Sequence, residues 1–515
     1  LSFGGKAKPY LTYNGVTMED MERYGRRYHD SGQYQTSAGP HVLADGSHVG
    51  YYDDQTDNYL QINNQLILNH RFNDRWALNA TAFYTYGYGY YKQYKDDAEL
   101  AEYVNLDTEI QEADLIREKI MRNHLGGLNA SASYTSRALD LNFGGSWSYY
   151  TCPHWGELDW VDGMDAGAIG GRWYDNDVDK HDANLFARAN WSVAKGLRLF
   201  ADLQYRYVSY QAWGVNDNYV SEEVGMQPIN VDKQYHFFNP RAGVSYTLAE
   251  RNNFYLSFAV AQKEPTRSDF TDRYKFAADD TYPSSEKLYD WELGYTYTAP
   301  RLSLGVNLYY MKYKDQLVPM GRINDGYDAL NDNVDDSYRR GVELSASWKV
   351  TGWFTASANA TFSQNRIENY TELRTVYDND EDWNVISDGP VALGTTKLAY
   401  SPETIANLIL DFHYGGFEAA FHTQYVGEQY FANNENDALS LDAYCVTNLN
   451  LSYSFRTRNA RRIRLGLQVN NLFNAEYENN GYGYSTWFRD SPSQHTALYF
   501  PQAPLNVLAN VTVKF

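Results

Sequence analysis

The sequence contains few cysteines, few prolines and no long apolar run. Among 515 residues there are 2 Cys, 7 Met and 14 Pro. Cys152 and Cys445 lie far apart, which excludes a disulfide framework and a CxxC metal knuckle. Mean hydropathy is -0.61, and no apolar run approaches the ~18 residues that a membrane-spanning helix needs. These absences exclude a helical membrane protein.

Basic residues are also scarce relative to acidic ones. The chain has 44 Lys and Arg against 65 Asp and Glu, a formal charge of -21. Such a surface would repel a phosphate backbone, so we expect no nucleic-acid partner. The sequence has no GxSxG, no HExxH and no close Ser/His/Asp set. We therefore predict that the protein is not an enzyme, and we assign it no catalytic residue, no metal site and no cofactor.

Aromatic residues are abundant, with 48 Tyr, 12 Trp and 16% aromatic residues overall. Aromatic side chains favour strands and interfaces. An all-β fold is therefore expected.

Strict alternation of apolar and polar residues recurs from one end of the chain to the other. Residues 139–149 are typical, because Leu, Leu, Phe, Gly, Trp and Tyr alternate with Asp, Asn, Gly and Ser. Successive side chains of a strand point to opposite faces, so each such segment has one apolar and one polar face. The same pattern recurs in residues 76–84, 199–207, 254–260, 302–310, 342–349, 354–362 and 463–470.

The connections between these segments alternate between short and long. The eight short ones are residues 73–75, 136–137, 194–196, 250–253, 299–300, 351–352, 415–416 and 456–461. The nine long ones are roughly residues 10–57, 92–119, 152–179, 212–234, 266–284, 316–335, 368–398, 432–440 and 478–503. Together they join about 18 antiparallel strands. Short turns at one end and long loops at the other are typical of a transmembrane β-barrel, whereas a propeller would repeat a blade motif.

The last strand carries a specific signal. Leu505, Val507, Ala509, Val511 and Val513 face one way, and the chain ends on Phe515. A final amphipathic strand that ends in Phe resembles the assembly signal of bacterial outer-membrane proteins.

Five segments resemble strands of the TonB-dependent outer-membrane receptors, in the correct order. Residues 469–477 (VNNLFNAEY) resemble the NLF-x-x-x-Y segment of the penultimate strand, and residues 238–246 (FNPRAGVSY) resemble an earlier strand of that family. Residues 255–266, 291–295 and 340–344 fit further family strands. The loops, rich in Tyr, Asn and Asp, look like those of receptors of the Bacteroidetes type.

The resemblance implies a 22-stranded barrel with an N-terminal plug. We interpret residues 1–515 as the barrel portion, the C-terminal part of such a barrel, without the plug, the energy-coupling box and about four strands. The alternative is a passive 18-stranded porin, and a third possibility is a barrel used as an adhesin or as a dock for a partner.

The resemblance also implies a function. Loops at the surface would bind a scarce nutrient, and the TonB complex would drive its import by pulling on the plug. A ferric siderophore is the first expectation for the cargo; haem, a cobalamin-like metal chelate or a glycan are alternatives. The implied partners are outer-membrane lipid, the TonB complex and possible surface lipoproteins, and the implied location is the bacterial outer membrane.

Several residues of the long loops are candidate ligand contacts. Aromatic side chains there could grip a large ligand or pack the loops together. Arg267 and Asp269 could contact a ligand or form a network within their loop. Two acidic runs, residues 175–179 and 378–382, space carboxylates like the start of a calcium loop but lack the glycine at its sixth position. The tryptophans among the candidates are Trp155, Trp160, Trp173, Trp383 and Trp487.

Overall fold

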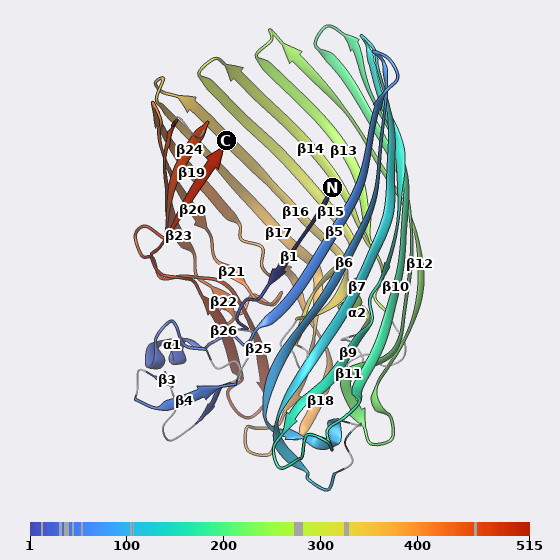
Figure 1. The fold of residues 1–515 in the computed structure, drawn as a ribbon, viewed down its shortest axis with the longest axis vertical. Helices are drawn as coiled ribbons and strands as arrows, with labels where there is room; N and C mark the ends of the chain where they lie inside the picture. Colours follow the sequence, from blue (N-terminus) through green and yellow to red (C-terminus); the bar gives the residue numbers. More distant parts are fainter. Residues whose placement is uncertain are drawn as a thin grey trace.

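A computed structural model shows a large antiparallel sheet whose tilted strands wrap into a barrel (Figure 1). The structure describes residues 1–11, 14–29, 33–35, 41–43, 46–52, 55–103, 106, 108–271, 282–323, 329–457 and 461–514. Phe515, the expected assembly signal, lies outside these residues. No helix in the described ranges is long and apolar enough to cross a membrane.

The main sheet contains 22 strands, and four of them belong to the long connections. These four are β9 (His154–Val161), β18 (Val385–Lys397), β25 (Glu478–Phe488) and β26 (Gln494–Pro501). The other eighteen form the barrel wall in the described part of the chain, as the alternation predicts. They are β1 (Ser2–Ala7), β5 (Asp57–Arg71), β6 (Trp76–Glu99), β7 (Glu112–Thr135), β8 (Leu139–Thr151), β10 (Arg172–Ala194), β11 (Leu197–Ser221), β12 (Gly225–Leu248), β13 (Asn252–Lys263), β14 (Glu286–Ala299), β15 (Leu302–Ile323), β16 (Ala329–Lys349), β17 (Phe354–Tyr377), β19 (Thr404–Tyr414), β20 (Phe417–Val426), β23 (Tyr444–Phe455), β24 (Arg462–Asn470) and β27 (Asn506–Lys514).

Short elements occupy the remaining connections. They are α1 (Met18–Tyr24), β2 (Gln33–Gln35), β3 (His41–Val42), β4 (His48–Tyr51), η1 (Leu100–Glu102), α2 (Arg267–Thr271), β21 (Gln429–Tyr430) and β22 (Ser440–Leu441). Thr17 caps α1 in a capping box with Asp20, which satisfies the first amides of this helix. Val16 bridges to Tyr499, so the first long connection rests on β26.

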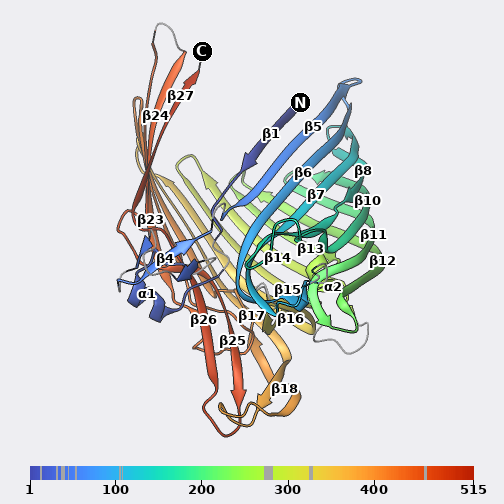
Figure 2. The same ribbon diagram turned by 60° about the horizontal axis from the view of Figure 1, so that its bottom comes forward.

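Each wall strand pairs with the next wall strand along the chain. The sheet starts at β1, which pairs with β5, and ends at β27, which pairs with β24. Among the described residues no ladder joins β1 to β27, and Figure 2 shows these two strands standing apart. Consecutive antiparallel pairing brings all short turns to one end of the wall and all long connections to the other.

The predicted apolar faces point outward. Leu256 is 52% exposed, Leu308 is 44% exposed and Leu467 is 37% exposed, although all three are large hydrophobic residues. A band of such side chains around the wall fits lipid contact. Polar residues alternate with them on the inner face, where Tyr255 donates a hydrogen bond to Asn307.

Several predicted loops are shorter than expected, because the strands continue past the membrane region. Residues 92–119 were expected as a connection, but β6 runs to Glu99 and β7 begins at Glu112. Residues 212–234 are also almost entirely strand, since β11 and β12 leave only 222–224 between them. The physical reason is cross-strand pairing, which continues the sheet wherever the partner strand is present and does not require an apolar face.

Candidate functional site

Two groups of side chains lie at the end of the barrel that carries the long connections. The first, called here the α2 cluster, consists of Glu264 and Arg267–Thr271 with their partners on β9 to β12 and on β16. The second, called the hairpin pocket, lies between the β17–β18 hairpin and the β25–β26 hairpin. Together they contain four of the seven predicted contact residues: Arg267 and Asp269 in the first, and Trp383 and Trp487 in the second.

A buried carboxylate holds the start of the α2 cluster to the wall. Glu264 is 7% exposed and follows β13 directly. It accepts hydrogen bonds from Lys180 Nζ at 2.6 Å and from Arg206 at 2.7 and 2.9 Å. Arg206 also binds Asp182 at 2.6 Å. Burial alone would raise the pKa of Glu264, but the hydrogen bonds from Arg206 and Lys180 outweigh it and lower this pKa to about 2.

Arg267 connects α2 to the β8–β10 connection. Its Nη1 lies 2.5 Å from His154 Nδ1, and its Nη2 donates to Asn176 Oδ1 at 2.7 Å. Burial and the neighbouring charge of Arg267 lower the pKa of His154 to about 3. The imidazole is therefore neutral at neutral pH. Its Nδ1 also lies 3.2 Å from the Cys152 carbonyl oxygen, and its Nε2 lies 3.7 Å from Cys152 Sγ.

Asp269 is also an internal contact. It is 4% exposed and accepts hydrogen bonds from the Thr266 amide at 2.6 Å and the Thr266 hydroxyl at 2.7 Å. Its other oxygen accepts from Asn331 at 3.0 Å. Phe270 stacks on Tyr210 with a ring separation of 5.4 Å. Arg267 and Asp269 thus take part in a hydrogen-bond network between the connections, and their contact with a ligand stays a prediction.

The tryptophans near β9 differ in exposure. Trp173 is 2% exposed within an apolar cluster, and the Arg117 guanidinium lies 5.6 Å from its ring centroid. Trp155 is 6% exposed, donates from Nε1 to Glu157 at 2.9 Å and lies under Arg172. Trp160, by contrast, is 40% exposed. Trp155 and Trp173 therefore pack the connection, whereas Trp160 is exposed.

The hairpin pocket forms where two distant segments pair. Val376 and Tyr377 of β17 lie in a parallel ladder with Trp487 and Phe488 of β25. The ladder continues past the strand ends, because the Arg489 amide donates to the Tyr377 carbonyl at 2.9 Å. This pairing brings the predicted residues Trp383 and Trp487 to one cavity.

This cavity has a volume of about 210 Å³. Arg374 lies over the Trp487 ring, 3.8 Å from its centroid, and its Nε donates to Glu372 at 2.5 Å. Glu372 is 4% exposed and also accepts from Asn434 at 2.7 Å. The cavity is lined by Glu372, Leu373, Arg374, Thr375, Tyr377, Trp383, Ala432, Asn434, Leu439, Ser485, Thr486 and Trp487.

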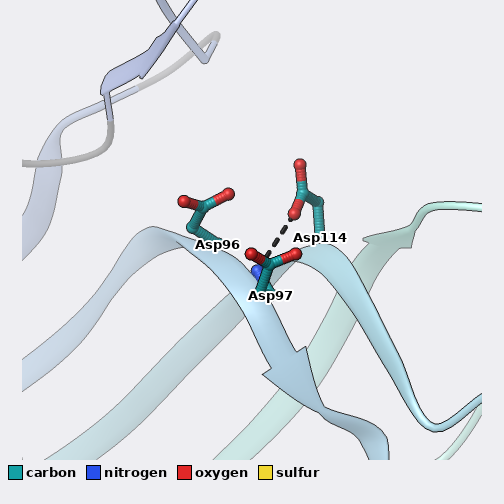
Figure 3. A group of neighbouring side chains, drawn as sticks. All are labelled: Asp96, Asp97 and Asp114. Atoms are coloured by element: carbon teal, nitrogen blue, oxygen red, sulfur yellow. Dashed lines mark hydrogen bonds between the residues drawn. The ribbon is translucent and has the colours of Figure 1, made fainter.

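One further acidic group lies at the tip of the β6–β7 hairpin (Figure 3). The carboxylates of Asp96, Asp97 and Asp114 lie within 4.8 Å of one another. Asp114 accepts hydrogen bonds from the Tyr94 hydroxyl and from the Asp97 amide, the latter at 3.0 Å. Burial and the charge of Asp114 raise the pKa of the Asp96 carboxyl. Carboxylates at this spacing could hold a cation, although two of the three are exposed.

The two predicted acidic runs do not gather in this way within the described residues. Residues 175–179 lie on β10, where alternation spreads their side chains along the strand. In the other run Asp378 accepts from the amides of Asn379 and Asn384 at 2.8 and 2.9 Å, which closes a turn. Neither run is built as a calcium loop.

Sequence reasoning named the tryptophans of the hairpin pocket but missed its charged pair. Glu372 and Arg374 lie two residues apart on one strand, a spacing that puts both side chains on the same face. That spacing was the available signal. The pairing with β25 had no local signal in the sequence.

Comparisons with known proteins identify the barrel. The family model described as "TonB dependent receptor-like, beta-barrel" matches residues 8–472. The pesticin receptor of Yersinia enterocolitica is 24% identical over 198 residues, which are 38% of this chain. The match spans only 26% of the length of that receptor.

Solved structures share the fold. The ferric-catecholate import receptor Fiu of E. coli K12 aligns with a TM-score of 0.63 and 15% identity, over 99% of this chain and 71% of Fiu. The siderophore receptor PiuA of Acinetobacter baumannii aligns with a TM-score of 0.65 and 13% identity, over 99% of this chain and 70% of PiuA. The long family-model match and the outward apolar band agree, and the chain therefore belongs to the TonB-dependent receptor family as a β-barrel of the outer membrane.

Proposed function

We propose that the protein captures a scarce metal chelate at its long connections and imports it with energy from the TonB complex. A ferric siderophore is the first candidate for the cargo, ahead of haem and cobalamin-like chelates. Family membership over residues 8–472 carries this proposal. Two barrels of similar fold, the ferric-catecholate import receptor Fiu and the siderophore receptor PiuA, lend it support.

The connection end supports a receptor role. Its network is largely preformed, because Glu264, Arg267 and Asp269 all have protein partners within 3.0 Å. A preorganised mouth loses less conformational entropy when a ligand binds. The predicted contacts Trp160 and Trp383 are 40% and 47% exposed, so they are the best placed to touch a cargo directly.

We propose further that a plug and additional strands complete the working transporter. The facing edges of β1 and β27 make no ladder with each other in the described residues. An unpaired backbone group in lipid costs several kcal/mol, so a working barrel has to close this gap. This cost disfavours the alternative of an 18-stranded porin. The plug would also carry the contact with the TonB complex, and a surface lipoprotein is a further possible partner.

Uptake of radioactive iron tests the proposal. Cells with and without the gene would receive ferric catecholate, ferric hydroxamate or ferric citrate, each with and without an uncoupler of the proton gradient. We expect uptake of at least one chelate to require both the gene and the gradient. Unchanged uptake of every chelate in the deletion strain would refute the proposed cargo class. Gene-dependent uptake that survives the uncoupler would favour a passive pore.

A further inference from the structure

We propose that the hairpin pocket binds one neutral, sugar-like ring with neighbouring hydroxyl groups. The inference concerns binding at the mouth and does not depend on the imported cargo or on the TonB complex. It rests on the size, charge and lining of the cavity between the β17–β18 and β25–β26 hairpins.

The size of the cavity limits the ligand to a single ring. Its volume of about 210 Å³ is below the range of roughly 300–1,000 Å³ that is typical of pockets for drug-sized ligands. A whole ferric chelate with three bidentate arms exceeds such a space. A terminal unit of a larger molecule fits it better.

The charge of the cavity disfavours an ionic ligand. Glu372 and Arg374 neutralise each other through a contact of 2.5 Å, and Asn434 binds the second carboxylate oxygen. An anion would meet the buried carboxylate of Glu372. A cation would compete with Arg374, which already occupies the face of the Trp487 ring at 3.8 Å. The site is therefore balanced for a neutral ligand.

The remaining lining suits a hydroxylated ring. Trp383 is 47% exposed but fixed, because its ring packs edge-on against Phe488 at 5.1 Å and its Nε1 donates to the Asp380 carbonyl at 2.9 Å. A fixed indole offers an apolar plate for the C–H face of a sugar.

Polar groups next to this plate are available to bind hydroxyls. Among the described residues, the two Nη groups of Arg374 and the hydroxyl of Thr486 make no hydrogen bond. The planar guanidinium presents its donors in a fork, which matches two adjacent hydroxyl oxygens. Trp487 and Glu372 act as positioning residues, since they fix this guanidinium from two sides.

A glycan array tests the class of ligand. The labelled full-length protein in detergent would be applied to neutral saccharides, acidic saccharides and polysaccharides. We expect retention on neutral saccharides. No retention on any saccharide, or retention on acidic ones alone, would overturn the proposal.

Calorimetry with the best neutral saccharide then tests the site. Trp383→Ala and Arg374→Gln should each weaken binding about tenfold or more. Trp383→Phe should keep part of the affinity, and Arg374→Lys should lose it because lysine lacks the planar fork. Trp353→Ala is the matched control and should bind normally, because Trp353 is also exposed but lies in the short turn before β17, at the opposite end of the wall. Equal loss in the Trp353 variant, or no loss in the pocket variants, would place the saccharide elsewhere.

A final arm identifies the source of the ring. If the saccharide belongs to an imported molecule, the free saccharide should slow iron uptake by competition. If it belongs to a surface polysaccharide, it should instead release the protein from that polysaccharide. Either result agrees with the proposed chemistry, whereas failure of both would leave the binding without a role and refute a receptor function for the pocket.

Discussion

Glu264 illustrates what single residues do in this molecule. Its carboxylate joins Lys180 on β10 and Arg206 on β11 to the segment that leads into α2. A buried charge is tolerated only while its ion-pair partners are present, because removing one charge leaves the others buried without compensation. The α2 cluster therefore depends on a few side chains that the sequence did not single out.

Glu264→Gln should loosen the α2 segment. The change keeps the shape but leaves Lys180 and Arg206 without their shared anion, so we expect local opening to become easier by about 3 kcal/mol. Hydrogen exchange of the amides of α2 should accelerate about a hundredfold. Glu403→Gln is the control, because Glu403 is 43% exposed in its pair with Arg366 and should change stability by less than about 1 kcal/mol. Similar effects in both variants would contradict the assigned role of Glu264.

His154 should make the same region sensitive to acid. Its folded pKa of about 3 lies below its ordinary value, so the opened state binds a proton at a higher pH than the folded state. The stability it contributes is complete above pH of about 6.5 and is lost as the pH falls toward 3. Between pH 7 and pH 5 we expect a loss of about 2 kcal/mol, measured as faster hydrogen exchange in β9 and α2.

The variant His154→Asn should flatten this pH dependence, since asparagine does not titrate. Titration of Glu264 does not contribute to the pH dependence above pH 5, because its pKa lies below 5 in both the folded and the opened state. An unchanged pH profile in the variant would show that another group controls the response.

Elements that follow local rules were predictable, whereas those that depend on distant partners were not. The alternation of residues 302–310 predicted a strand, and β15 covers it. The extension of β6 to Glu99 was missed, because its outer part has no apolar face and relies on pairing with β7. Trp383 and Trp487 line one cavity only because β17 pairs with β25, a strand that lies far away in the sequence. Just beyond the paired residues, the hydroxyl of Ser491 donates to the carboxylate of Asp380, a residue 111 positions earlier. The aromatic composition of the long connections predicted both tryptophans as contact residues. It did not predict that the two side chains line the same cavity.

The element β9 offers a test of this distant packing. A Cβ atom added at Gly156 would lie 2.3 Å from Trp173 Nε1 and 2.4 Å from the Tyr174 ring, and both rings are buried. We expect Gly156→Ala to destabilise β9 by about 1–3 kcal/mol through overpacking. Limited proteolysis of the connection that includes residues 162–171 should then be faster. Gly167→Ala adds its methyl group to open space in the same connection and should leave the rate unchanged. Equal rates in the two variants would contradict the packing described for β9.

At the scale of the whole molecule, one face of the sheet contacts lipid and the other faces the aqueous lumen. The outer face carries large apolar side chains, and the inner face carries polar ones, as the period of two required. The seam between β1 and β27 is a second feature of the described wall that no local pattern indicated. The short turns fix how each of the eighteen wall strands pairs with its neighbour. Closure of the barrel depends instead on the strands that pair with the facing edges of β1 and β27.

Adjacent residues of β16 test which face meets lipid. Leu344 is 41% exposed on the outer face and pairs with Val306, whereas its neighbour Ser345 points inward and pairs with Gly305. An arginine on the lipid face costs about 2–4 kcal/mol near the bilayer midplane and less near the interfaces, but an arginine in the lumen stays in water. Leu344→Arg should therefore lower the fraction of folded barrel, measured by heat-modifiable mobility and by unfolding in lipid bilayers. Ser345→Arg has room beside Gly305 and should fold nearly as well as the parent. If the Ser345 variant lost as much stability as the Leu344 variant, the assignment of outer and inner faces along this strand would be wrong.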